Sequence, residues 1–157
     1  MPGPLSLIFS RGRHPGSALI RAWPPAGPWS HCGVIVGGSV VEATMLRGVV
    51  STPLAEFQRR ASLWAVIDLR CPRPEDGEAW ALSRIGAGYD WGGALGIVLR
   101  EPELSDGGRE YCSMMVCRAT RAGGNPILKA NALPHGVTPQ SAWALLLAAD
   151  GKVRGAR

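Results

Sequence analysis

The chain has 157 residues, of which 46% are hydrophobic and 18% are charged, so it can bury a core and is not compositionally disordered. Its net charge of +5 comes almost wholly from arginine, since Lys129 and Lys152 are the only lysines. The basic residues form no run longer than Arg59-Arg60, and no aromatic stripe accompanies them. Specific nucleic-acid binding is therefore not expected, whereas an anionic partner or a peripheral contact with an anionic membrane remains compatible with the charge.

The first half of the chain predicts a strand at residues 5–9 and one or two helical turns at 17–23. Residues 30–36 and 39–45 are two runs rich in β-branched side chains, and Gly37-Gly38 separates them. Two such runs around a two-residue glycine turn are typical of a β-hairpin. We therefore expect a hairpin in which Val36 pairs with Ser39.

The second half predicts more helix than strand. After a short helix at 53–60 and a strand at 63–69, helices are expected at 75–85, 91–99, 112–122 and 141–149, the last buried on several sides, with polar loops at 101–109 and 131–140. These elements indicate one α+β domain over residues 1–150, with an antiparallel sheet packed against helices. Residues 151–157 are expected to form a frayed tail.

The sequence contains no apolar run near the roughly 20 residues that cross a bilayer, and from its N-terminal residues we expect no signal peptide. We therefore expect a cytoplasmic protein whose four cysteines are free thiols. They form no CxxC pair, and Cys112 and Cys117 lie five apart, so neither a metal site nor a cofactor is predicted.

Cys112 is the first candidate for chemistry, because it follows a polar loop and opens a predicted helix. A helix N-terminus stabilises the thiolate, which is the nucleophilic form of cysteine. Position alone also fits a small buried cysteine without a chemical role. A nucleophilic thiolate needs an imidazole within reach, and that imidazole needs a third group to fix its tautomer.

His31 and Glu42 can supply those two groups if the hairpin has the register given above. Residues alternate sides along a strand, so His31, Gly33, Glu42 and Thr44 would share one face, with Glu42 diagonal to His31. A slip of one residue would move Glu42 to the other face, and an exposed glutamate on a half-solvated strand is the alternative. The same alternation points Cys32 away from His31, into the core.

Three stretches of the chain together resemble the circularly permuted papain-like proteins of the NlpC/P60 superfamily, and in particular their YiiX/YaeF-like group. These stretches are WSHCGVIV at 29–36 followed by VEAT at 41–44, GYDWGG at 88–93 followed by YCSMMV at 111–116, and VTPQSA at 137–142. The histidine precedes the cysteine here, which is the permuted order. A segment near 17–21 resembles versions encoded in bacteriophages. Met114 departs from the pattern, because an acidic residue is usual there.

The resemblance implies a cysteine amidase or peptidase with Cys112 as nucleophile, His31 as base and Glu42 as the residue that orients His31. It further implies that Tyr111, Tyr89 and Trp29 belong to the oxyanion or substrate-binding site. The expected substrate is a peptide, a peptidoglycan fragment or an acyl amide, cleaved through a thioester acyl-enzyme.

Two alternatives use the same fold. One is a lipid acyltransferase or thioesterase, with Trp23, Trp29 and Trp91 lining an acyl groove. The other is a non-catalytic interaction module, for instance in phage infection.

Overall fold

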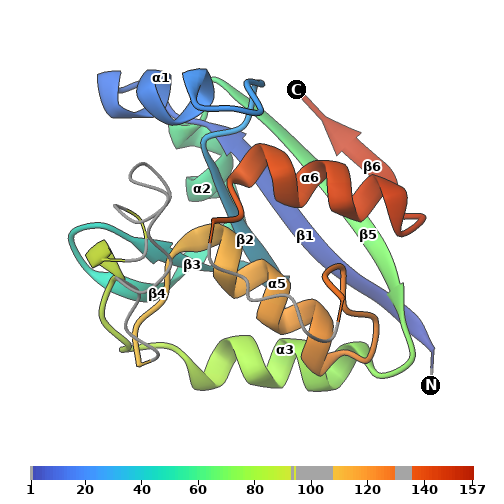
Figure 1. The fold of residues 1–157 in the computed structure, drawn as a ribbon. Coiled ribbons are helices and arrows are strands. Elements are labelled where there is room, and N and C mark those ends of the chain that lie inside the picture. Colours follow the sequence, from blue (N-terminus) through green and yellow to red (C-terminus); the bar gives the residue numbers. More distant parts are fainter. Residues whose placement is uncertain (1, 93, 95–107, 130–135) are drawn as a thin grey trace.

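The computed structural model describes residues 2–92, 94, 108–129 and 136–157, and this part of the chain forms a six-stranded sheet with helices packed on it (Figure 1). The strand order is β4-β3-β2-β1-β5-β6, and all neighbouring strands are antiparallel. The strands are β1 (Gly3–Arg11), β2 (His31–Val36), β3 (Ser39–Thr44), β4 (Gly48–Pro53), β5 (Leu63–Cys71) and β6 (Lys152–Ala156). The helices are α1 (Pro15–Ala22), α2 (Leu54–Arg60), α3 (Pro74–Ser83), α5 (Cys112–Ala122) and α6 (Pro139–Ala148).

The centre of the sheet is β1, which is buried on both faces because its apolar residues do not alternate with polar ones. Leu5, Leu7 and Phe9 belong to a large core shared with α5 and α6. Ile8 points to the other face and joins a smaller core with Phe57 of α2. The sheet therefore separates α2 from α3, α5 and α6, which lie across the opposite face (Figure 1).

The α+β class, the antiparallel sheet and the hairpin predicted from the sequence are confirmed. Val36 pairs with Ser39, and Gly37 and Gly38 form the turn with positive φ angles of 55° and 82°. The helix predicted at 112–122 has the same bounds in the structure. The expected helix at 91–99 and the loop at 101–109 fall largely outside the described residues, as does most of the loop at 131–140.

Three elements differ from those expected from the sequence, namely β4, α6 and the C-terminal residues. Strand β4 was not predicted, although its Val49, Val50 and Thr52 are β-branched. Helix α6 starts at Pro139 and is only partly covered, because Leu147 is 46% exposed. One side of this helix therefore meets the core, through Ala142 and Leu146, and the other faces solvent.

The expected frayed tail is also wrong, because residues 152–156 form strand β6 along the edge of β5. Asp150 has a φ of 65°, which turns the chain back after α6. Trp64 and Arg157 exchange two backbone hydrogen bonds of 2.9 Å each, and Arg154 Nε donates to Asp68 Oδ2 at 2.7 Å. A polar segment such as this gains its structure from the open edge of β5, which the local sequence does not reveal.

Within the described residues, no helix combines the length and the apolar character that crossing a membrane would require.

Gly33 allows β2 and β3 to approach each other beside His31. A Cβ atom at this position would lie 2.5 Å from Val40 Cγ1 and 2.8 Å from the backbone oxygen of Val41. We expect Gly33→Ala to destabilise the protein by about 1–3 kcal/mol, because backbone atoms must shift to admit the methyl group.

Thermal unfolding measures this effect, with roughly 2–4 °C in Tm expected for each kcal/mol in a protein of this size. Gly155→Ala is the matched control, since its Cβ would meet Trp64 only at 3.7 Å. Equal Tm values for the two variants would show that β2 and β3 are less tightly apposed.

Candidate functional site

A cavity of about 770 Å³ opens at the end of the sheet where β2 begins, and Cys112, His31 and Glu42 all line it. Its wall also includes residues from the segment before α1, from the β3–β4 turn and from α2. Cys112 is the first residue of α5 and is 8% exposed. The three residues that the sequence singled out are thus brought to one place by three different elements.

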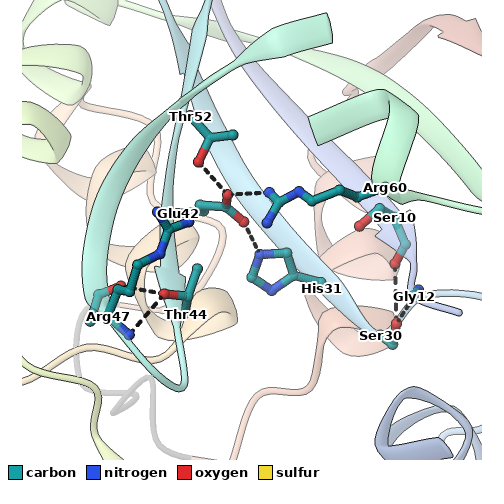
Figure 2. Close-up of polar contacts among 10 residues, drawn as sticks. Ser10, Gly12, Ser30, His31, Glu42, Thr44, Arg47, Thr52 and Arg60 are labelled. Atoms are coloured by element: carbon teal, nitrogen blue, oxygen red, sulfur yellow. Dashed lines mark hydrogen bonds and ion pairs between the residues drawn. The ribbon is translucent and has the colours of Figure 1, made fainter. Parts of the chain in front are cut away.

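The His31 ring is bound to the Glu42 carboxylate. The distance between His31 Nε2 and Glu42 Oε2 is 2.6 Å, and Glu42 is 1% exposed (Figure 2). Because Glu42 occupies Nε2, the nitrogen that remains for the Cys112 thiol is Nδ1. Phe57 of α2 stacks on the imidazole with the ring centroids 5.7 Å apart, which fixes the plane of the ring.

The second carboxylate oxygen of Glu42 is also fully used. Thr52 Oγ1 donates to Glu42 Oε1 at 2.6 Å, and the Arg60 guanidinium donates to the same oxygen (Figure 2). Burial by itself would raise the pKa of Glu42, but the hydrogen bonds from His31, Thr52 and Arg60 lower it to about 2. The carboxylate therefore stays ionised and holds His31 in one orientation.

The Cys112 thiol has two neighbours, His31 and Cys32. A hydrogen bond from the Cys32 side chain is the largest cause that lowers the pKa of Cys112 well below its usual value. Burial opposes this effect, whereas a hydrogen bond and the charge of His31 add to it. Burial and the nearby Cys112 thiolate raise the pKa of Cys32, so the proton shared by the two thiols stays on Cys32.

The imidazole carries the proton that Cys112 loses. Burial alone would lower the pKa of His31, but its hydrogen bonds with Cys112 and Glu42 outweigh burial and raise it to about 10. The lowered pKa of Cys112 and the raised pKa of His31 both favour a thiolate beside an imidazolium. This ion pair is the reactive form of a cysteine nucleophile with a histidine partner.

The two halves of this pair come from opposite sides of the sheet. Cys32 and Val34 of β2 belong to the core that contains α5, whereas His31 stacks on Phe57, on the α2 side. Because β2 begins at His31 and α5 begins at Cys112, the ring and the thiol meet where both elements start.

Ser30 fixes the chain just before His31. Its hydroxyl accepts a hydrogen bond from the backbone N–H of Gly12 at 3.0 Å and donates to the Ser10 carbonyl at 3.4 Å (Figure 2). It also accepts a hydrogen bond from Ser17 Oγ at 2.6 Å. Ser17 lies in α1, so this buried contact joins the start of β2 to the helix that follows β1. The serine before the histidine thus positions the strand that carries His31.

Glu110 fixes the chain just before Cys112. It is fully buried, and its Oε1 accepts from Arg84 Nε at 3.0 Å and from Arg118 Nη1 at 2.7 Å. Burial raises the pKa of Glu110, although both arginines act to lower it. Backbone hydrogen bonds from Asp90 to Glu110 and from Glu110 to Gly88 then tie the segment that carries Tyr89 to the start of α5.

Of the three residues predicted to bind substrate, Tyr89 lines the cavity, whereas Tyr111 and Trp29 do not. Tyr89 lines the cavity together with Trp91, and their rings make an edge contact at 5.2 Å. Tyr111 is 1% exposed, and its hydroxyl accepts a hydrogen bond from the Gly136 backbone N–H at 3.2 Å, which gives its side chain a structural role. It does not line the cavity.

Trp29 requires the clearest correction. Its ring packs in the core against Phe9 and Trp143, with centroids 6.1 Å and 4.8 Å away, and it does not reach the cavity. Trp23 does not line the cavity either, so only Trp91 of the three tryptophans proposed for an acyl groove is at the site.

Sequence reasoning missed four residues that contact Cys112, His31 or Glu42, namely Cys32, Thr52, Phe57 and Arg60. Thr52 lies in the strand that was not predicted, although its β-branched neighbours gave a signal for that strand. Phe57 and Arg60 lie on one face of α2, but no local pattern indicates that α2 packs over the hairpin. Cys32 was assigned to the core, and its contact with Cys112 depends on where α5 packs.

No protein-family model matches the chain, and no curated protein matches it in sequence. Among solved structures, the fold is similar to the metalloprotein YiiX from Escherichia coli O157:H7 (DUF1105). The TM-score is 0.72 with 17% sequence identity, over 99% of this chain and 98% of YiiX. At this identity the likeness concerns the fold alone. Of the resemblance that the sequence motifs carry, it supports the YiiX-like fold and not the activity.

The described residues of this chain do not fit a metal centre. They contain no group of three or more His, Cys, Asp or Glu side chains placed to hold one ion. Glu42 binds His31 Nε2 at 2.6 Å, so this ring nitrogen is already used within the protein.

The contrast among the four thiols gives a first prediction for this site. Burial raises the pKa of Cys32, Cys71 and Cys117, the last to about 12, whereas that of Cys112 is lowered. Iodoacetamide at about pH 6 should therefore alkylate Cys112 at least about tenfold faster than the other three, as measured by peptide mass spectrometry.

The pH dependence of the alkylation rate shows whether Cys112 reacts fast because it is ionised or only because the reagent can reach it. A thiolate that is already formed should react at a nearly constant rate between about pH 6 and 9, until His31 loses its proton near pH 10. A rate that instead rises tenfold per pH unit over this range would mean that Cys112 has an ordinary pKa.

Proposed function

We propose that this protein is a cysteine hydrolase that cleaves an amide or acyl bond through a thioester acyl-enzyme, on a circularly permuted papain-like fold. The observation that carries the proposal is the unbroken series of contacts from Cys112 to His31 to Glu42 in the wall of a cavity. A merely structural cysteine has no need of an ionised imidazole or of a buried carboxylate behind it.

The first half of the reaction forms the acyl-enzyme. The Cys112 thiolate attacks the carbonyl carbon, and the π electrons of the carbonyl move onto its oxygen. When the tetrahedral intermediate collapses, the bond to the leaving group breaks, and His31 Nδ1 gives its proton to that group. Glu42 holds the ring and stabilises its charge before this transfer.

The second half uses water. Neutral His31 removes a proton from a water molecule that attacks the thioester carbon. The carbon–sulfur bond breaks, the acid is released, and the thiolate–imidazolium pair is restored. The same atoms serve both halves, which is why one fixed imidazole orientation is sufficient.

The N-terminus of α5 suits the developing oxyanion. The first N–H groups of a helix have no partner within the helix, and the Tyr111 side chain makes no capping hydrogen bond to them. The Cys112 backbone N–H therefore belongs to the set of donors from which an oxyanion site can be built, beside the reacting sulfur.

The chain order supports the permuted assignment. His31 and Glu42 lie on the hairpin near the N-terminus, and Cys112 opens a helix about 80 residues later. Helix α5 packs on β2 and β3, so the hairpin and the cysteine helix form one unit in spite of that separation. The substrates that the resemblance implies are peptides, including peptidoglycan stem peptides.

Transfer of the acyl group to an acceptor other than water is a second candidate. It is favoured by the apolar side chains of Ile20, Met45, Leu46 and Trp91 around the cavity, which suit an acyl chain. The thioester step is common to both reactions.

The acyl-enzyme itself can be observed. We expect p-nitrophenyl acetate to acetylate Cys112 with a burst of nitrophenolate, and mass spectrometry of the acid-quenched protein to place the acetyl group on the Cys112 peptide. Cys112→Ser should abolish the burst, and Cys117→Ser is the matched control that should retain it. Acetylation spread over other residues, with no preference for Cys112, would contradict the proposal.

Glu42→Gln tests the positioning role. An amide donates a hydrogen bond to Nε2 or accepts one without charge, so the imidazolium loses its partner and its tautomer is no longer set. We expect the rate of acylation to fall at least about tenfold and the pKa of His31 to fall toward its usual value. Glu75→Gln, at an exposed position of α3, is the control.

The pH profile distinguishes positioning from a general loss of structure. In Glu42→Gln the alkaline limb of the acylation profile should move down from about pH 10 together with His31. A variant that keeps both its rate and its profile would reduce the catalytic group to Cys112 and His31.

A further inference from the structure

The charged groups around the cavity do not balance. The lining residues that the structure describes include one acid, Glu42, and its charge is paired with Arg60. The Cys112 thiolate is paired with the His31 imidazolium. When these two pairs are set aside, the guanidinium groups of Arg13 and Arg47 remain as positive charges at the cavity.

Arg47 and Arg13 come from separate segments. Arg47 is exposed on the β3–β4 turn, where its backbone N–H donates to Thr44 Oγ1 at 3.3 Å and leaves the side chain at the cavity (Figure 2). Arg13 precedes α1, and its Nη2 donates to the Ala61 carbonyl at 3.1 Å. Within the described part of the chain, neither guanidinium makes an ion pair with a carboxylate.

Apolar side chains lie beside these two charges. Leu46 is 95% exposed and Met45 is 42% exposed, and both are next to Arg47 on the same turn. Trp91, on the segment tied to Glu110, is 53% exposed. Three large apolar side chains that line one cavity and yet face solvent are typical of a ligand-binding surface.

We infer that the substrate of this site carries an anionic group, a carboxylate or a phosphate, on an apolar portion next to the bond that is cleaved. Arg47 binds the anion, Arg13 adds to the positive potential, and Met45, Leu46 and Trp91 contact the apolar portion. This inference rests on the proposed function, because it places the scissile carbonyl at Cys112. It adds a specificity-determining residue, Arg47, outside the catalytic group.

The chemistry favours arginine for this task. A guanidinium offers a planar pair of N–H donors that matches the two oxygens of a carboxylate or phosphate, and it stays charged at all relevant pH values. The catalytic ion pair and the Arg60–Glu42 pair are each close to neutral overall. An anion that enters the cavity therefore experiences the charges of Arg47 and Arg13, since Glu42, the one acid among the described lining residues, is paired with Arg60.

Matched thiol reagents test the inference without any need for turnover. The probes are 3-maleimidopropionic acid and N-propylmaleimide, which have the same reactive ring but differ in charge. The second-order rate constant for Cys112 is measured with each by mass spectrometry, and their ratio is divided by the same ratio for free N-acetylcysteine. We expect the corrected ratio to favour the carboxylate by at least about tenfold in the wild-type protein.

Variants then assign the preference. Arg47→Met should lower the corrected ratio to about one-tenth of its wild-type value. Arg47→Lys should restore part of the ratio, because lysine returns the positive charge but not the planar pair of N–H donors. Arg59→Met is the control, because Arg59 is exposed on α2 and does not line the cavity. A corrected ratio near one in the wild-type protein, or an equal loss in Arg47→Met and Arg59→Met, would overturn the inference.

The same assay separates the two anions and separates this inference from the proposed function. Inorganic phosphate and acetate are added as competitors of the anionic reagent, and the one that protects Cys112 at lower concentration identifies the bound group. Protection by neither would contradict an anion site. Acetylation of Cys112 by p-nitrophenyl acetate without a charge preference would sustain the hydrolase and overturn only the anionic substrate.

Discussion

The buried carboxylate of Glu42 is the group on which the rest of the site depends. It is 1% exposed on β3, between β4 and β2, where an unpaired charge would be very costly. Three donors from three elements remove that cost: His31 from β2, Thr52 from β4 and Arg60 from α2. The same contacts fix the hairpin, its neighbouring strand and the helix above them, so the catalytic geometry and the local fold have a common origin.

The reactivity of Cys112 follows from this arrangement. Glu42 stabilises a protonated His31, His31 stabilises the Cys112 thiolate, and the Cys32 thiol adds a further hydrogen bond. Glu42 thus raises the pKa of His31, and the protonated His31 in turn lowers the pKa of Cys112. The result is an ion pair in a cavity wall, in a chain whose other three thiols have pKa values raised by burial.

The proposed function divides binding and catalysis between different parts of the cavity. In the proposed function, the charges of Cys112, His31, Glu42 and Arg60 are paired with one another, and recognition is left to side chains at the β3–β4 turn, before α1 and around Tyr89. These segments differ from the sheet in that they connect regular elements, where a change of side chain does not disturb the core. The likeness to YiiX extends over nearly the whole chain, but it concerns the path of the backbone, and recognition depends on individual side chains.

The sequence by itself determined the elements whose causes are local. The glycine turn fixed the hairpin register and hence the common face of His31 and Glu42, and a polar loop before an apolar run placed Cys112 at a helix start. It did not determine contacts between distant segments. Strand β6 exists because β5 has an open edge, Trp29 is buried because Phe9 and Trp143 meet it, and Thr52 and Arg60 reach Glu42 only through the packing of β4 and α2. Such contacts depend on how the elements pack in three dimensions, and neither periodicity nor spacing along the chain records that information.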